Sequence, residues 1–99
     1  MTFEMIYGMN VVDDVKYQQY RESIAPLLAE HGGGFRYDFV VSHTLKSEAT
    51  HPINRVFAIY FPTREQKDAF FANPAYKQVR AALYVNAVNG STMIAEYER

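Results

Sequence analysis

The sequence predicts an α+β fold, in which a four-stranded antiparallel sheet is combined with two helical stretches. Four stretches of apolar residues have the alternation or the length of strands, and two others carry apolar residues at helical spacing. They follow one another in the order β-α-β-β-α-β. The chain has 99 residues, of which 48% are hydrophobic, and this is enough for one core but not for two. We therefore predict a single domain over residues 1–99.

The predicted third strand, residues 55–61, is the element around which the others are arranged. It is apolar or aromatic except for Arg55, and it stops at Pro62. A strand with one wet face alternates apolar and polar side chains, but both faces of this strand are apolar. Its two faces hold Phe57, Ile59 and Phe61 on one side and Val56, Ala58 and Tyr60 on the other. We therefore expect a separate cover on each side of it.

The first strand and the first helix are predicted over residues 2–12 and 14–31. Alternation places Phe3, Met5, Tyr7, Met9 and Val11 on one face of that strand. Asp13 is a good N-cap for the helix, and Gly32 suits the left-handed position that follows its last turn. The apolar stripe of the helix consists of Tyr17, Tyr20, Ile24, Leu27, Leu28 and His31.

The second strand is predicted over residues 35–45, with Phe35, Tyr37 and Phe39 on one face. It is the most polar of the four strands, so we expect it at an edge of the sheet. A polar connection over residues 46–53 leads from it to the third strand. This connection is too long for a tight hairpin.

The second helical stretch begins at the capping-box pattern of Thr63 and Gln66. Asn73 followed by Pro74 predicts a second segment that starts there and runs to about residue 83. We expect residues 84–91 to be irregular, with a turn at Asn89-Gly90, and residues 92–98 to form the last strand. Two interleaved right-handed β-α-β crossovers in this order make a ferredoxin-like fold.

A ferredoxin-like sheet has helices on one face only, so the other face of the apolar third strand would be bare in a monomer. An exposed apolar patch of that size is unusual for a monomeric protein. A closed dimer, in which the sheets of two copies pack against each other, is the economical way to cover it. We therefore predict a homodimer formed by sheet-to-sheet packing.

Composition and charge argue against several functional classes. The net charge is −1 with scattered positive charges, so we expect no binding to nucleic acid or to an anionic membrane. No apolar run is long enough to span a bilayer, and residues 1–10 lack the features of a signal peptide. The chain contains no cysteine. A cytoplasmic location is the simplest interpretation.

Five residues are candidates for ligand binding: Tyr20, His31, Tyr37, Arg55 and Tyr60. A tyrosine hydroxyl can donate a hydrogen bond to a ligand oxygen, a histidine can act as acid or base near neutral pH, and a guanidinium can clamp a carboxylate or an enolate. Each also has a structural interpretation. The tyrosines can be core or interface residues, His31 can complement the helix dipole, and Arg55 can pair with an acid such as Glu4 or Glu96.

Metal and nucleophile chemistry find little support in the sequence. The three histidines, at positions 31, 43 and 51, lack the spacing of metal ligands. No serine has a nucleophile-elbow context, and Gly32-Gly33-Gly34 follows a helix, so it cannot present helix N–H groups to a phosphate. We expect no metal and no other cofactor, and no catalytic residue can be named.

The chain resembles the family known as domain of unknown function 1330, within the dimeric α/β-barrel superfamily. The resemblance spans nearly the whole sequence and rests on the order and spacing of short motifs. These are Asp13, Tyr17, Tyr20-Arg21, Pro26, His31-Gly32-Gly33, Asn54-Arg55-Val56, Phe61-Pro62-Thr63, Phe71 and Asn73-Pro74-Ala75-Tyr76. Two departures stand out: the 46–53 loop is longer than usual, and Leu83-Tyr84-Val85 occurs where the family often carries a basic residue.

The resemblance implies a ferredoxin-like protomer whose sheet packs on that of a partner, and it implies no established activity. The surplus of aromatic residues, eight Tyr and seven Phe, favours a pocket between sheet and helices that binds a small apolar or aromatic metabolite. One alternative is a cofactor-independent monooxygenase or isomerase, as found in relatives within the superfamily. Another is a dimer that interacts with other proteins and has no ligand. Whether the protein is an enzyme stays open at this stage.

Overall fold

The computed structural model describes residues 1–99 and contains one sheet and a set of helices. Its elements are β1 (Phe3–Val11), α1 (Asp14–Glu30), β2 (Gly34–Val40), β3 (Arg55–Phe61), α2 (Arg64–Ala72), α3 (Pro74–Val79), the π-helical segment η1 (Arg80–Tyr84), α4 (Val85–Ala87) and β4 (Val88–Glu98). The strands form one antiparallel sheet in the order β2-β3-β1-β4. This confirms the predicted ferredoxin-like order.

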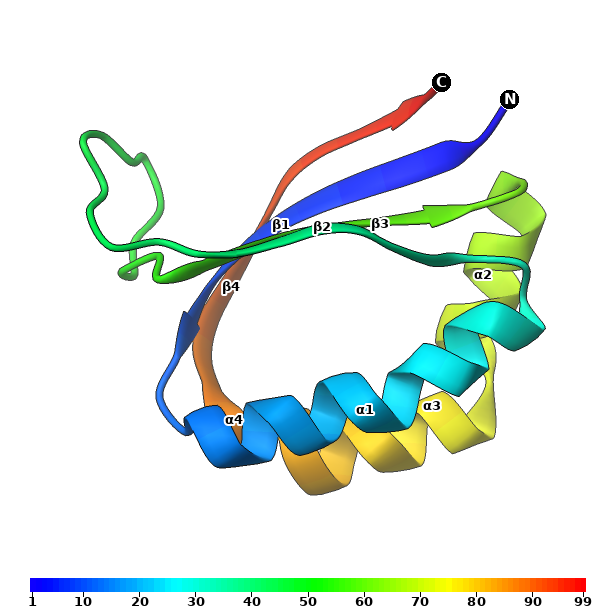
Figure 1. The fold of residues 1–99 in the computed structure, drawn as a ribbon, viewed down its shortest axis with the longest axis horizontal. Coiled ribbons are helices and arrows are strands. Elements are labelled where there is room, and N and C mark those ends of the chain that lie inside the picture. The colour runs from blue at the N-terminus through cyan, green and yellow to red at the C-terminus, as the bar shows by residue number, and fades with distance from the viewer.

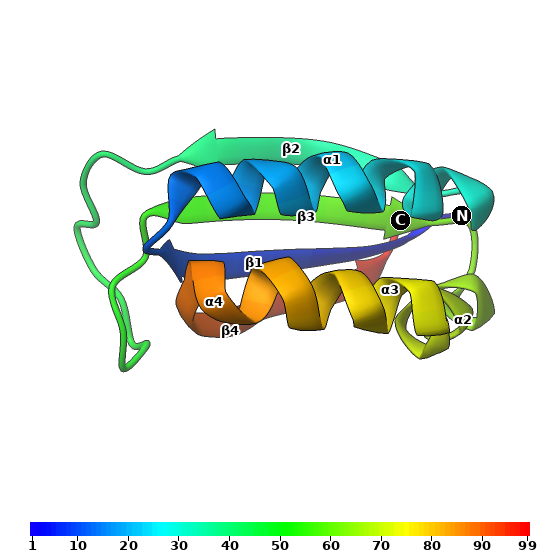
Figure 2. The same ribbon diagram turned by 90° about the horizontal axis from the view of Figure 1, so that it is seen from below.

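All helices lie on the same face of the sheet (Figure 1). Figure 2 shows α1 running along one half of the sheet, while α3, η1 and α4 continue one another as a single rod along the other half. The hydrophobic core lies between these two layers. It is built from Phe3, Met5, Met9, Val11, Tyr17, Tyr20, Ile24, Leu28, Phe57, Ile59, Phe61, Phe70, Tyr76 and Ala87.

The predicted helix ends are confirmed by their hydrogen bonds. Asp13 accepts from the Lys16 N–H at 3.0 Å, and Thr63 accepts from the Gln66 N–H at 3.1 Å. Each bond satisfies an N–H group that has no partner within its helix. Asn73 similarly accepts a bond in the first turn of α3. These caps depend on neighbours in the sequence, which explains why they could be predicted.

Strand β2 differs from the prediction in its length and in its faces. It lies at the sheet edge as expected, but it ends at Val40 and not at residue 45. A register shift separates Phe35, which pairs with Ile59, from Tyr37, which pairs with Ala58. The extra residue turns Tyr37 to the opposite face, as a β-bulge does. The prediction that Phe35 and Tyr37 share a face is therefore wrong.

The segment predicted to be irregular, residues 84–91, is ordered secondary structure. Helical backbone continues to Ala87, and β4 begins at Val88, so the expected turn at Asn89-Gly90 is absent. Contacts with distant residues extend the helix here. The ring centroids of Tyr84 and Tyr20 are 4.9 Å apart, and the Ala87 carbonyl accepts from the Val12 N–H at 2.8 Å.

The face of the sheet away from the helices is uncovered in the protomer, and we call it the open face. It carries Val56, Ala58 and Tyr60 of β3, so both faces of that strand are apolar as predicted. No helix covers this face, although Ala58 is buried and Val56 and Tyr60 are partly buried. Among its side chains Tyr37 is 54% exposed and Ile94 is 52% exposed. Contacts within the protomer therefore leave about half of each side chain exposed to solvent.

Candidate functional site

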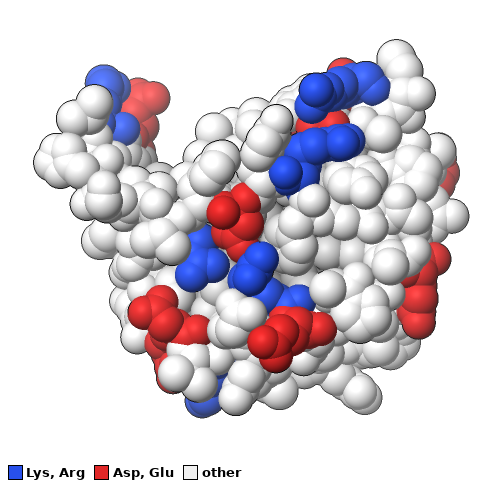
Figure 3. Space-filling model, viewed as in Figure 1, with Lys and Arg blue, Asp and Glu red and all other residues white.

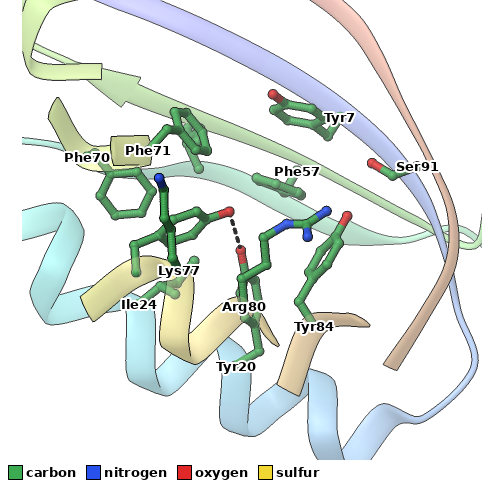
Figure 4. Close-up of a pocket in the computed structure, with 12 residues that line it drawn as sticks. Tyr7, Tyr20, Ile24, Phe57, Phe70, Phe71, Lys77, Arg80, Tyr84 and Ser91 are labelled. Carbon is green, nitrogen blue, oxygen red and sulfur yellow. Dashed lines mark hydrogen bonds between the residues drawn. The ribbon is translucent and has the colours of Figure 1, made fainter. Parts of the chain in front are cut away.

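A cavity of about 420 Å³ lies between the helices and the sheet. Strands β1, β3 and β4 supply one wall, and helices α1, α2 and α3 with η1 supply the other (Figure 4). Its volume falls in the range of small-molecule sites, and nine of the twelve lining residues are hydrophobic. Such a cavity suits a small, mostly apolar ligand.

Aromatic rings form most of the cavity wall. On the sheet side, Tyr7 and Phe57 are stacked, with ring centroids 5.4 Å apart and planes 18° apart. On the helix side, Phe70 and Phe71 meet edge to face with centroids 5.1 Å apart. The two sides together offer flat surfaces on which a planar ring can pack.

The π-helical segment η1 brings a cation and a phenol to the same wall. The Val85 N–H donates to the Arg80 carbonyl, five residues back, which makes the turn wider than an α-helical turn. Arg80 and Tyr84 both line the cavity, and the Arg80 guanidinium carbon lies 5.1 Å from the Tyr84 ring centroid. Single π-helical turns occur frequently at functional sites.

The tyrosines of the cavity have raised pKa values. Burial is the main cause for Tyr7, whose pKa rises to about 12, and for Tyr84. Burial also raises the pKa of Tyr20, and the neighbouring Tyr76 adds to the effect, since the two hydroxyl oxygens are 3.4 Å apart. All three phenols are therefore protonated at neutral pH and able to donate a hydrogen bond to a ligand oxygen.

A second hollow, of about 710 Å³, lies on the open face between β4 and the loop of residues 41–54. Figure 3 shows this loop standing clear of the rest of the molecule. His51 holds the loop to β4 through a 2.8 Å hydrogen bond between its Nε2 atom and the Thr92 hydroxyl. Val56 and Ile94 lie in the hollow, so it is continuous with the apolar open face.

The profile of one protein family, the domain of unknown function DUF1330, matches residues 5–97. The chain belongs to the DUF1330 family. This confirms the resemblance seen in the sequence. A comparison with curated proteins found no match.

Solved structures similar to this DUF1330 chain share its fold at low sequence identity. A protein of unknown function from Rhodopseudomonas palustris has a TM-score of 0.81 and 15% identity, over 99% of this chain and 82% of that one. A dimeric ferredoxin-like protein of unknown function from Jannaschia has a TM-score of 0.62 and 13% identity, over 100% of both chains. A candidate antibiotic biosynthesis monooxygenase from Nitrosomonas europaea has a TM-score of 0.64 and 17% identity, over 100% of this chain and 98% of that one.

The structure does not bring together the five binding residues suggested by the sequence of this DUF1330 protein. Tyr20 lines the cavity. Tyr37 and Tyr60 belong to the open face. His31 caps the end of α1, where its Nδ1 atom lies 3.2 Å from the Gln66 Oε1 atom. Arg55 is on the helix side of the sheet but does not line the cavity.

Arg55 takes part in a cluster of charges between α1 and β2. Its guanidinium lies 3.6 Å from the Asp38 carboxylate, which also pairs with Arg21. Arg55 thus forms an ion pair, as the structural interpretation expected, but its partner is Asp38 and not Glu4 or Glu96. The bulge in β2 is the physical reason, because it turns Asp38 toward the helices, opposite Phe57. The guanidinium also lies 4.8 Å from the Tyr17 ring centroid.

The residues that the sequence reasoning missed come mainly from the second helical wall. Lys77, Arg80 and Tyr84 line the cavity, and their spacing of three and four residues places them on one helical face. Continuing the predicted helix beyond residue 83 would have revealed this face. Ser91 of β4 also lines the cavity and has no signal in the local sequence.

Two further kinds of site, a metal centre and a membrane-spanning helix, are absent from the structure. No group of three or more His, Cys, Asp or Glu side chains is placed to hold a metal ion. No helix combines the length and the hydropathy needed to cross a bilayer.

Proposed function

We propose that this protein is a homodimer that binds a small apolar or aromatic molecule in the cavity between its sheet and its helices. The cavity itself is the observation that supports binding. It is mostly apolar, and its few polar groups come from the tyrosines, Ser91, Lys77 and Arg80. Sites for small molecules have this composition.

The open face supports the homodimer. Tyr37, Phe39 and Ile94 are all more than half exposed there, beside the apolar side chains of β3. Packing two such faces together removes them from water and closes the assembly by two-fold symmetry. The similar structure from Jannaschia is that of a dimeric protein, which supports a homodimer.

A cofactor-independent oxygenase is the second candidate function, and the similar structure from Nitrosomonas europaea favours it. Such chemistry needs a group that removes a proton from the substrate. The cavity is lined by neither histidine nor carboxylate, and its phenols have pKa values raised by burial. These groups suit hydrogen-bond donation better than proton abstraction, so binding is the stronger proposal.

Ligand binding can be tested by thermal unfolding with a panel of aromatic acids, aromatic alcohols and quinones. A ligand present at ten times its Kd stabilises the folded state by ~1.4 kcal/mol, which raises the midpoint by several degrees. We expect at least one compound to do so. A panel without any stabilising compound would contradict the proposal.

A matched pair of variants locates the binding. Ser91→Trp places a large ring at the cavity mouth, where Ser91 is exposed, and should abolish the stabilisation. Gln78→Trp adds the same ring at an exposed helix position that does not line the cavity, and should leave it unchanged. Equal loss in both variants would place the ligand elsewhere.

A further inference from the structure

We infer that the ligand of this cavity is an aromatic anion, whose ring lies deep in the cavity and whose charged oxygen lies between Lys77 and Arg80 at the mouth. The inference rests on the proposed function and adds the chemical class of the ligand. An aromatic carboxylate and a phenolate share the chemistry that these residues would recognise. Experiments on both distinguish between them.

The polarity of the cavity changes with depth. Its inner end is formed by buried side chains, among them Tyr20, Ile24 and Phe57. Lys77, Arg80 and Ser91 are exposed members of the lining, and Figure 4 shows the two cations extending from the helical wall. A ligand that matches this gradient has an apolar ring inside and a polar group outside.

The charges at the mouth have one sign. Lys77 and Arg80 are the only charged residues in the lining, although the whole chain has a net charge of −1. Neither forms an ion pair with a carboxylate, in contrast to Arg21, Arg36 and Arg55. Two unpaired cations at the opening of an apolar cavity favour a ligand with a negative charge.

The phenols of the cavity add hydrogen-bond donors. Tyr7 lies on the sheet wall, and Tyr84 lies beside Arg80 on the helical wall. With pKa values raised by burial, both stay protonated and can donate to an anionic oxygen. The lining therefore supplies several donors and no negative charge, and the nearby carboxylate of Glu96, which adds to the raised pKa of Tyr7, lies outside it.

The inference is tested by calorimetry with three probes: 2-naphthoate, its neutral amide 2-naphthamide, and 4-nitrophenol at mildly alkaline pH, where it is ionised. We expect 2-naphthoate to bind roughly three- to tenfold more tightly than the amide, as suits ion pairs at a partly exposed mouth. Binding of 4-nitrophenolate alone would assign a phenolate. Equal affinity for 2-naphthoate and the amide, without phenolate binding, would overturn the inference and leave the proposed function intact.

Variants then assign the preference to the two cations. The double variant Lys77→Gln/Arg80→Gln should lose the preference for the anion and keep its affinity for the amide. Lys46→Gln/Arg64→Gln removes the same charge from residues outside the cavity and should bind as the unmodified protein does. An unchanged preference in the first variant would overturn the role of Lys77 and Arg80. Absence of binding by every probe would contradict the inference together with the proposed function.

Discussion

Glu4 is a carboxylate near the start of β1 on the open face, and its side chain is fully buried. It accepts hydrogen bonds from Arg36 at 2.9 Å, from the Tyr97 hydroxyl at 3.1 Å and from the Thr2 hydroxyl at 3.1 Å. Burial alone would raise the pKa of Glu4, but these bonds and the charge of Arg36 outweigh burial and lower it. A buried carboxylate is tolerated only with such partners.

The Glu4 network predicts a dependence of stability on pH. Because the folded pKa is below the usual value of 4.5, the unfolded chain binds the proton more readily than the folded chain. The contribution of Glu4 is therefore complete above pH 4.5 and is lost as the pH falls through the lowered pKa. Urea unfolding of Glu4→Gln at neutral pH should show a loss of about 1–3 kcal/mol.

The same measurement in acid distinguishes this explanation from a general loss of packing. As the pH falls below 4.5, the unmodified protein should lose part of its advantage over Glu4→Gln. Glu48→Gln, in the exposed loop, should follow the unmodified protein throughout. A constant difference between Glu4→Gln and the unmodified protein from neutral pH down to acid would contradict an ionised Glu4 in the folded state.

At the scale of the elements, those whose ends depend on neighbouring residues could be predicted, and those stabilised by distant contacts could not. Asp13 and Thr63 mark helix starts because each bonds to a backbone group three residues ahead. The register shift after Phe35 and the helical turns beyond Leu83 depend on β3, α1 and β1, so no local pattern signals them. The register shift explains why Tyr37 leaves the helix side of the sheet, whereas Tyr60 lies on the open face by the regular alternation of β3.

Asn54 is a second case of a long-range contact that shapes an element. Its side chain binds the end of β1 twice, accepting from the Val11 N–H at 2.8 Å and donating to the Val11 carbonyl at 2.9 Å. Its backbone N–H donates to the Met9 carbonyl at 2.9 Å. The side chain thus takes the place of a strand residue where β1 runs past the start of β3.

Removing this side chain should loosen the end of β1. Asn54→Ala leaves the N–H and carbonyl of Val11 without these partners, so we expect a loss of about 2 kcal/mol in the free energy of unfolding. Hydrogen exchange at the Val11 amide should become faster. Asn86→Ala, at an exposed helix position, is the control and should change neither. Unchanged exchange in Asn54→Ala would show that the hydrogen bonds of the Asn54 side chain do not stabilise the end of β1.

At the scale of the whole molecule, the apolar side chains on the two faces of β3 have different surroundings. Phe57, Ile59 and Phe61 face the protein's own helices and belong to the core. Val56, Ala58 and Tyr60 face away from them, next to the exposed Tyr37 of β2 and to Glu4 of β1. The exposed Tyr97 of β4 lies on the far side of Glu4. The sequence could show that both faces need a cover, and the structure identifies the face that needs one from outside.

The proposed homodimer predicts that substitutions on the open face can disrupt the dimer without unfolding the protomer. Tyr37→Lys and Ile94→Lys change side chains that are 54% and 52% exposed in the protomer, so each variant should fold. In the dimer they would bury an unpaired charge, which is strongly unfavourable.

Sedimentation at micromolar concentration should give twice the chain mass for the unmodified protein and a shift toward the chain mass for both variants. Val15→Lys is the matched control, because Val15 is 71% exposed on α1, away from the open face, and should leave the dimer intact. Circular dichroism should show the same helix and strand content in all four proteins. If both open-face variants sediment as dimers, the two copies meet through another surface. The exposed side chains of β2 and β4 would then need a different explanation.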